Sequence, residues 1–331
     1  MCLITVLMPM RNAQRYVLEA IESILSQTSV DLEVLVIDDG STDQSAEIVS
    51  RIDDERVRMV PGPCGGISVA LNHGLDLATG EFIARCDADD IYPADRFAWQ
   101  LQFLQDHADY AAVCGSYCTV THKGQTIVEH DGGSVAMDIS DELKRGLIRS
   151  HIGAFLVRKS AYTELGGFRP YFVTAEDIDL QLRLGEIARV WYEPKQAYRH
   201  RLHDESVTYS KGNEVRFFFE TSAKRLQEQR RQSGKDDLQQ DNPPLPPVVL
   251  VSQPSKSIEQ VQGMLINLAW REHGAGQKFK AMLAGWRAVW SNPRKLSAWR
   301  NLAYLTLKRP RIHPTQPARP PHGVPLANRP R

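Results

Sequence analysis

The sequence is poor in the features that mark several classes of protein. Its 331 residues include five cysteines, which form no CxxC pair and show no His/Cys metal spacing, so we expect reduced thiols in a cytoplasmic protein. No apolar run approaches the roughly 18 residues of a membrane-spanning helix. The first ten residues, MCLITVLMPM, lack the basic segment and the cleavage site of a signal peptide and favour a first strand instead.

The sequence also has no excess of charge of either sign. Lys plus Arg and Asp plus Glu both number 40, which argues against nucleic acid as a partner. The balance hides two unequal parts, because residues 256–331 hold 14 basic and 2 acidic side chains, whereas residues 1–255 hold 26 and 38. Residues 256–331 therefore carry a net charge of +12, and residues 1–255 carry a net charge of −12. We expect the two parts to lie in different surroundings.

Over its first 115 residues the sequence alternates regularly between two spacings of apolar residues, one typical of strands and one typical of helices. Short apolar runs, which are typical of buried strands, are followed by segments with apolar residues at the spacing of one helix face. This alternation predicts an α/β domain with a mostly parallel sheet. The expected strands are 3–8, 32–37, 56–60, 81–86 and 110–115, and the expected helices are 17–25, 42–52, 66–78 and 93–107.

Beyond residue 120 the alternation loosens, which favours an α+β arrangement. Segment 232–254 is rich in proline, as linkers are. Residues 255–307 have helical spacing again, and the Pro/Arg-rich residues 308–331 are expected to be disordered. The elements expected before the linker are strands at 125–130, 151–158, 189–193 and 197–203, a helix starting near Thr174 and a long polar helix over 211–231.

Polar segments follow three of the expected strands, at 9–12, 38–40 and 87–90. Ligands of open α/β sheets bind beyond the carboxyl ends of the strands, yet no GxGxxG follows the first strand to bind phosphate through backbone N–H groups. Asp87 and Asp89 in DADD can face one ligand from an extended loop, and carboxylates suit Mg²⁺ or Mn²⁺. The segment therefore predicts a divalent metal that bridges protein and diphosphate, with a solvated, helix-capping turn as the alternative.

Four ordered segments resemble family 2 glycosyltransferases: VLMPMRNAQRYVLEAIESILSQT, LEVLVIDDGSTD, GGISVALNHGLDLATGEFIARCDADDIYPADRFAWQ and TAEDIDLQLRL. The resemblance covers about residues 3–210 and implies the glycosyltransferase A fold, an inverting reaction and a metal cofactor. It also implies a catalytic domain over 1–231, with a nucleotide-binding half at 1–115 and an acceptor half at 116–231. The basic helical extension at 255–307 lies outside it.

The resemblance implies roles for single residues. Asp39 would hydrogen-bond the nucleotide base, and Asp87 and Asp89 would hold the ribose and the metal. Asp177 would be the base that deprotonates the acceptor hydroxyl. His203 would complete the metal or diphosphate site. The residues expected in this way are Pro9, Arg11, Asn12, Asp39, Asn72, Arg85 and Asp87 for the nucleotide-sugar, Asp87, Asp89 and His203 for the metal, and Asp177 with Glu176 for catalysis.

Taken by themselves, the same residues have plainer explanations. Asp39 precedes a glycine and can be a turn former. Asp177 can be a first-turn acid that interacts with the helix dipole. A lone histidine such as His203 is often a surface residue, and His200 competes for its role. Arg85, inside a strand beside the acids, is expected to pair with them or with a diphosphate.

Three places depart from the family pattern. Arg11 stands where the family usually carries an aromatic residue two positions after Pro9, and Leu71 stands where it often carries Arg before Asn72. Residues 151–153 read His-Ile-Gly, where relatives often read His-Pro-Ser on the acceptor side. The identities of the base, the sugar and the acceptor are therefore left open.

These patterns together predict a cytoplasmic, inverting glycosyltransferase that uses a nucleotide-sugar, expected to be UDP-linked, with Mg²⁺ or Mn²⁺. The expected acceptor is a hydroxyl of a glycan or of a lipid-linked saccharide. The alternatives are a nucleotidyltransferase and a non-catalytic sugar-nucleotide-binding protein on the same fold. The extension at 255–307, with Trp beside Lys and Arg, predicts either docking at the inner face of the plasma membrane on anionic lipid or a cap packed on the catalytic domain.

Overall fold

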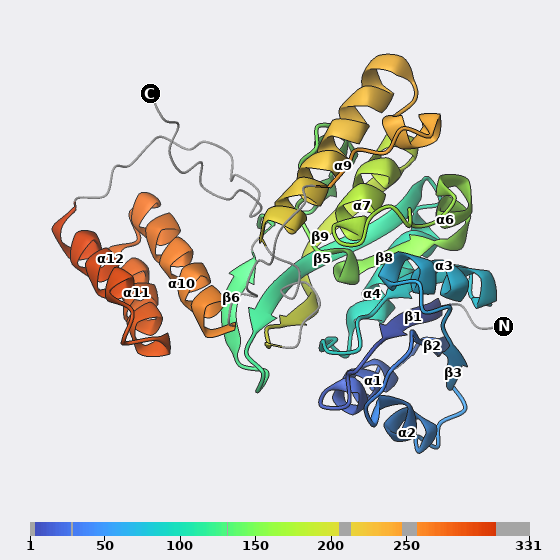
Figure 1. The fold of residues 1–331 in the computed structure, drawn as a ribbon, viewed down its shortest axis with the longest axis horizontal. Coiled ribbons are helices and arrows are strands. Elements are labelled where there is room, and N and C mark those ends of the chain that lie inside the picture. The colour runs from blue at the N-terminus through green and yellow to red at the C-terminus, as the bar shows by residue number, and fades with distance from the viewer. Residues whose placement is uncertain (1–3, 28, 131, 205–212, 247–256, 309–331) are drawn as a thin grey trace.

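A mixed sheet runs through the main body of the molecule (Figure 1). The computed structural model describes residues 4–27, 29–130, 132–204, 213–246 and 257–308. The strands are β1 (Ile4–Met10), β2 (Leu32–Asp38), β3 (Val57–Pro61), β4 (Phe82–Arg85), β5 (Tyr110–Val120), β6 (Thr126–His130), β7 (Met137–Asp138), β8 (Phe155–Arg158) and β9 (Arg189–Arg201). In these described ranges they pair in the order β3-β2-β1-β4-β8-β5-β9-β7, with β6 on β5.

The first half of the sheet is parallel, as the alternation predicts. Strands β3, β2, β1 and β4 run in the same direction. Along β1, Met8 packs in the core on one face and Leu7 on the other, and strands covered on both faces read as continuous apolar runs. The register sets Met10 beside Asp38 and Leu7 beside Arg85. The loops after β1, β2 and β4 therefore leave the sheet at one edge.

The second half makes the sheet mixed. Strand β8 runs antiparallel between β4 and β5, while β9 runs parallel to β5. The two strands expected at 189–193 and 197–203 are one strand, because Pro194 and Lys195 form a bulge between the partners of Gly115 and Ser116. A bulge accommodates a proline without ending the strand. Strand β7 and the short helices α5 (Ser140–Lys144) and α6 (Lys159–Leu165) were not expected from the sequence.

Helices cover both faces of the sheet (Figure 1). On one face lie α1 (Val17–Leu25), α2 (Ser45–Ser50) and α4 (Arg96–Asp106), and on the other α3 (Ile67–Leu77), α7 (Glu176–Ile187) and α9 (Asn213–Ser233), with α5 and α6. The helix expected near Thr174 begins at Glu176. The apolar spacing of the first helix is confirmed, since its core-facing residues are Val17, Ala20, Ile21 and Ile24.

The segment expected to be helical beyond the linker forms α10 (Ser257–Gly274), α11 (Lys278–Ser291) and α12 (Leu296–Leu307), beside the main body (Figure 1). We call this unit the helical extension. Leu265 of α10 packs with Ile127 and Val128 of β6. Nη2 of Arg287 donates to the carbonyl oxygen of Thr126 at 2.9 Å. The extension is therefore attached to the hairpin of β5 and β6.

Of the predicted linker, the structure describes residues up to 246, including a 3₁₀ turn at Asp237–Gln240. The rest of the linker and the tail from 309 onward lie outside the described residues. Among the described helices, none has the length and apolar character needed to cross a membrane.

Gly115 marks a contact between β5 and β9 that leaves no room for a side chain. A Cβ there would lie 2.4 Å from the carbonyl oxygen of Lys195. We expect Gly115→Ala to lower the free energy of unfolding by about 1–3 kcal/mol, because the backbone must shift to admit the methyl group. Urea unfolding followed by circular dichroism measures this change.

The matched control is Gly263→Ala in α10, where a Cβ would meet nothing within 4 Å. Because glycine weakens a helix interior, this change should raise the free energy of unfolding by about 0.5–1 kcal/mol. A Gly115→Ala protein as stable as the wild type would contradict the packing of β9 against β5.

Candidate active site

A cavity of about 1770 Å³ opens at the carboxyl ends of β1, β2 and β4. Its walls are the loops after these strands, the start of α7, and residues of β5, β6 and β9, and one face of α10 lines it as well. Of the predicted site residues, the cavity is lined by Pro9, Arg11, Asn12, Asp39, Arg85, Asp87, Asp89, Glu176, Asp177 and His203.

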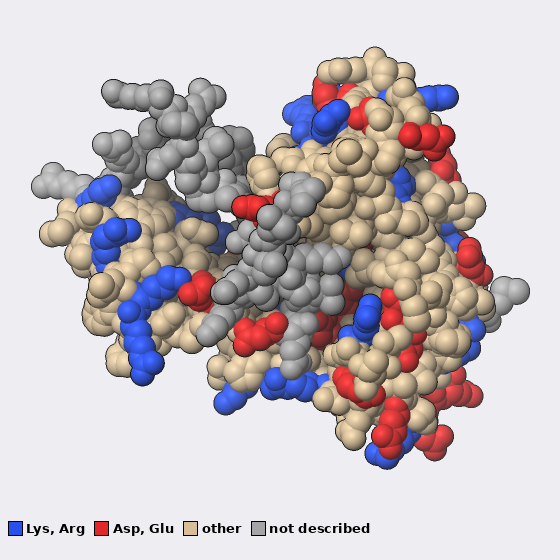
Figure 2. Space-filling model, in the orientation of Figure 1, with Lys and Arg blue, Asp and Glu red and all other residues tan. Residues whose placement is uncertain are grey.

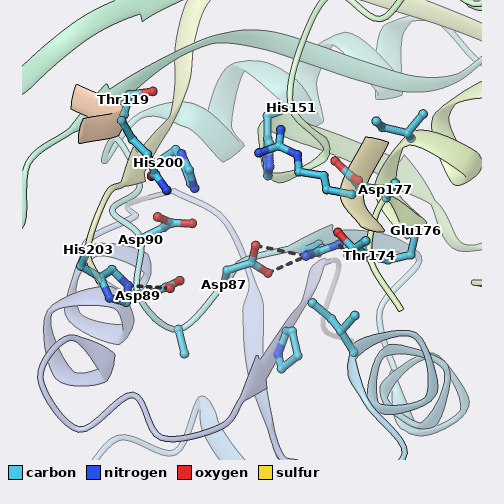
Figure 3. Close-up of a pocket in the computed structure, with 18 of the residues that line it drawn as sticks. Asp87, Asp89, Asp90, Thr119, His151, Thr174, Glu176, Asp177, His200 and His203 are labelled. Atoms are coloured by element: carbon cyan, nitrogen blue, oxygen red, sulfur yellow. Dashed lines mark hydrogen bonds and ion pairs between the residues drawn. The ribbon is translucent and has the colours of Figure 1, made fainter. Parts of the chain in front are cut away.

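Asp89, after β4, and His203, after β9, lie together at the floor of this cavity (Figure 3). Nε2 of His203 is 2.9 Å from Oδ2 of Asp89. Burial raises the pKa of Asp89, but the hydrogen bond and charge of His203 outweigh burial and leave that pKa lowered. His200 also faces the acids, and burial lowers the pKa of its imidazole despite the charges of Asp89 and Asp87.

The Asp89–His203 pair has the chemistry of part of a divalent-metal site. Two neighbouring ligands of an octahedral ion with bonds of about 2.1 Å lie about 3 Å apart, close to the separation of these two atoms. Among the described residues there is no group of three or more His, Cys, Asp or Glu side chains around one point. The pair therefore suits an ion that takes its other ligands from phosphate and water, as Mg²⁺ commonly does.

Asp87, the third predicted ligand, is engaged differently. Arg85 donates from Nε and Nη2 to its two carboxylate oxygens, at 2.8 and 3.2 Å. Nη1 of Arg85 donates to Oε1 of Glu176 at 2.9 Å. Arg85 and Glu176 are both buried, and charge-assisted bonds of this kind are the strong ones. Arg85 thus joins the loop after β4 to the start of α7.

The two acids at the start of α7 differ in their surroundings. Burial raises the pKa of Glu176, and the nearby charge of Asp177 adds to the rise, against the opposing effect of Arg85. Asp177 lines the cavity (Figure 3) and makes no hydrogen bond or ion pair with another described side chain. Ala175, just before them, has a left-handed backbone with φ of +61°. Such strain in a residue other than glycine is often found beside functional groups.

Asp179 turns away from the cavity. It is buried, and its Oδ2 accepts from Nε of Arg183 at 2.8 Å while its carboxylate also pairs with Arg169. Asp179 is therefore a structural anchor of α7, and only Asp177 of this pair presents an open carboxylate to the cavity.

At the other end of the cavity, Asp39 holds the loop before α3. Its Oδ2 accepts from the backbone N–H of Gly66 at 2.9 Å. Its Oδ1 is buried without a hydrogen-bond partner in the part of the chain that the structure describes. Asn12, with φ of +54°, accepts from the N–H of Thr42 and ties the loops after β1 and β2 together. A buried, unpaired carboxylate oxygen is costly unless a ligand supplies a donor.

Asn72 is the one predicted site residue that the structure leaves out of the cavity lining. Its amide donates to the carbonyl oxygen of Phe168 and accepts from the N–H of the same residue, both at 2.8 Å. Asn72 does not line the cavity. The side chain fixes the turn before Phe168.

Arg201 is a residue that sequence reasoning missed. It is buried at the end of β9, donates from Nε to the carbonyl oxygen of Asp89 at 2.8 Å, and donates from Nη2 to Glu19 at 2.7 Å. Asp90, also buried, accepts from the hydroxyl of Tyr198 and from the backbone N–H of Arg201. The signal was present in the sequence, since a basic residue stands between two histidines in HRLH.

Side chains of β5 and of the loop before β8 line the cavity between the acids and α10 (Figure 3). The ring of His151 stacks on that of Tyr198, with centroids 4.7 Å apart. Oγ1 of Thr119 lies 2.8 Å from Nε2 of His130. His151 falls in the segment that the resemblance assigns to the acceptor side.

The Arg85 contacts give a test by double mutation. We expect Arg85→Met to lower the free energy of unfolding by about 3–5 kcal/mol, because it leaves the buried carboxylate of Glu176 unpaired. Adding Glu176→Gln should recover a large part of that loss, since the second change removes the unpaired charge. Urea unfolding of both single variants and the double variant measures the coupling, and additive losses would contradict a shared buried ion pair.

Comparisons with known proteins identify relatives of this chain. A protein of Bacillus subtilis named as a candidate glycosyltransferase, EpsE, is 31% identical over 228 residues, which are 64% of this chain and 79% of EpsE. The hyaluronan synthase of Pasteurella multocida is 30% identical over 212 residues, 63% of this chain. The match spans 21% of that synthase, so the chain corresponds to about a fifth of its length.

Solved structures give the fold. The crystal structure of S. aureus TarS 1–349 in complex with UDP-GlcNAc matches this chain with a TM-score of 0.57 at 16% sequence identity. The match covers 93% of this chain and 92% of the TarS chain. The predicted α/β fold of the glycosyltransferase A type, with C-terminal helices, is confirmed. The model of the family described as glycosyl transferase family 2 matches residues 5–171. The chain belongs to the family 2 glycosyltransferases.

Proposed function

We propose that the protein transfers a sugar from a nucleotide-sugar, with UDP as the nucleotide, to a hydroxyl of a saccharide or lipid-linked saccharide, with inversion at the anomeric carbon. One observation carries the proposal: a single cavity holds the unpaired oxygen of Asp39, the Asp89–His203 pair and the open carboxylate of Asp177. Family membership supports it, as do similar proteins named hyaluronan synthase and chondroitin synthase and a similar structure that holds UDP-GlcNAc.

The unpaired oxygen of Asp39 supports uracil as the base. A carboxylate only accepts hydrogen bonds, and the N3–H of uracil is a donor. The N3 of cytosine is an acceptor, so it would face Asp39 without a hydrogen. Guanine also offers N–H donors on this edge, which makes GDP-sugars the comparison to test against UDP-sugars.

The proposed reaction gives each acid a role. The acceptor oxygen attacks the anomeric carbon, Asp177 takes its proton, and the bond from that carbon to the diphosphate oxygen breaks with the electron pair leaving on the diphosphate. One displacement inverts the anomeric configuration. Asp89 and His203 would hold Mg²⁺ or Mn²⁺, which when bound would supply positive charge for the diphosphate. Arg85 keeps Asp87 and the start of α7 at a fixed separation while this occurs.

The cysteines support a reducing compartment. In the described part of the chain, Cys64, Cys86, Cys114 and Cys118 are all free thiols. Burial raises the pKa of the Cys86 thiol to about 12, so this thiol is chemically inert at neutral pH. We therefore propose the cytoplasm as the place of action.

A donor screen tests the proposed function. The purified chain is incubated with Mn²⁺ and a set of UDP- and GDP-sugars, and release of the free nucleoside diphosphate is measured. We expect turnover of at least one UDP-sugar, and loss of it in EDTA. Binding of UDP-sugars without any turnover, with or without saccharide acceptors, would favour the non-catalytic alternative.

Asp89 carries the proposed metal site. We expect Asp89→Asn to abolish Mn²⁺-dependent binding of UDP, measured by titration calorimetry, because the amide removes the charged ligand. Asp95→Asn, an exposed acid six positions on, serves as the matched control and should bind as the wild type does. Undiminished Mn²⁺-dependent binding in Asp89→Asn would place the metal elsewhere.

Asp177 is the proposed catalytic base. We expect Asp177→Asn to reduce transfer by roughly 10²–10⁴-fold while donor affinity barely changes, since general-base catalysis is typically worth this factor. Glu214→Gln, on another wall of the same cavity, is the control and should keep most activity. Transfer by Asp177→Asn at the wild-type rate would show that another group takes the proton, with Glu176 the first to examine.

A further inference from the structure

Helix α11 turns its large apolar side chains outward. Phe279, Leu283, Trp286 and Trp290 follow one another at spacings of four, three and four residues, which places them on one helix face. They are 82%, 54%, 43% and 76% exposed. The face of α11 that packs inward is formed by the small residues Ala281, Ala284, Gly285, Ala288 and Val289. In an ordinary surface helix the large apolar side chains face the core, whereas in α11 they face outward.

Helix α12 continues the same surface. Leu296 and Leu307 are 82% and 80% exposed, and Trp299 is 44% exposed. The rings of Trp286 and Trp299 meet edge to face with centroids 6.1 Å apart, so the exposed residues of the two helices adjoin. We call this surface, made of the exposed apolar side chains of α11 and α12, the α11–α12 face. Contiguous exposed apolar surface of this kind marks an interaction site.

The charged residues of α11 and α12 are all basic. Residues 278–308 contain seven Lys and Arg residues and no Asp or Glu, and Figure 2 shows Lys and Arg gathered over the helical extension. Arg287 bonds the β6 backbone and Lys295 pairs with Glu259. Lys280, Arg294 and Arg300 are exposed, and Lys280 and Arg300 directly follow Phe279 and Trp299 in the sequence. A partner with complementary charge is therefore anionic.

We propose that the α11–α12 face docks on an anionic lipid bilayer. Trp and Phe seat at the boundary of headgroups and acyl chains, and Lys and Arg next to them gain from anionic headgroups. The core of a protein interface, by contrast, is depleted of charged residues. The inference goes beyond the proposed sugar transfer and does not rest on it.

Docking in this way has a consequence for the catalytic cavity. Gln260, Met264 and Asn267 of α10 line that cavity, while α11 packs on α10 in the same extension. In the docked protein the helical extension would therefore lie between the bilayer and the cavity.

Vesicle binding by the full chain tests the proposal. The probes are vesicles of phosphatidylcholine alone and of phosphatidylcholine with phosphatidylglycerol, with co-sedimentation and Trp emission as the two readouts. We expect binding to the anionic vesicles with a blue shift of Trp emission, and little binding to the neutral ones. Phe279→Ser with Trp290→Ser should weaken the partition by about tenfold or more. Lys280→Gln, Arg294→Gln and Arg300→Gln together should weaken it by about fivefold for each charge removed.

Matched controls come from the main body. Leu245→Ser with Val135→Ser removes apolar residues that are 85% and 67% exposed, and Lys123→Gln, Arg145→Gln and Lys224→Gln together remove three exposed charges. Both controls should bind vesicles as the wild type does, and circular dichroism should be unchanged in all variants. Equal losses in variants and controls, or no binding to anionic vesicles, would overturn the proposal. So would a dimer in sedimentation that Trp290→Ser dissolves, or binding of DNA in preference to vesicles.

Discussion

The buried guanidinium of Arg85 is the contact on which the arrangement of the site depends. It bonds Asp87 in the loop after β4 and Glu176 at the start of α7, two segments far apart in the sequence. Removing one partner of a buried ion pair leaves an unpaired charge and costs several kcal/mol. Arg85 therefore ties the loop after β4 directly to the helix that carries Asp177.

Hydrogen bonds from other segments of the chain stabilise the acidic loop. Asp89 lies against His203, and Asp90 accepts from the backbone of Arg201 and from Tyr198. The Arg201 side chain also holds the carbonyl oxygen of Asp89. Burial raises the pKa of Asp90 well above its ordinary value, and the charges of Asp89 and Asp87 add to the rise. The loop can thus hold three acids with the Asp89–His203 pair facing the cavity.

The sequence predicted the parallel half of the fold well because buried strands and one-sided helices have different apolar periods. It did not predict that β9 is continuous, since Pro194 looks like a strand end and a bulge is set by the neighbouring strand. It placed Asn72 at the nucleotide-sugar from family likeness, whereas the pairing with Phe168 arises from tertiary contact. Arg201 went unrecognised because its partners lie in loops from elsewhere in the chain.

The helical extension shows a second limit of sequence reasoning. The spacing of Phe279, Leu283, Trp286 and Trp290 indicates a helix face, but large apolar faces usually pack inward. Here small residues such as Ala284 and Gly285 allow α11 to pack closely on its neighbours, and the large residues lie outside. The periodicity predicts which residues share a helix face, but whether that face points inward or outward depends on how α10, α11 and α12 pack together and on β6.

The most direct measurement is the anomeric configuration of the first sugar released or transferred from a UDP-sugar. Proton NMR recorded in the first minutes of turnover, before the free sugar equilibrates, distinguishes the two anomers. We predict the anomer opposite to that of the donor, because a single displacement assisted by Asp177 inverts the carbon. Release of the same anomer as the donor, or no turnover of any nucleotide-sugar by a folded chain with Mn²⁺, would contradict the assignment of this cavity as the site of an inverting transfer.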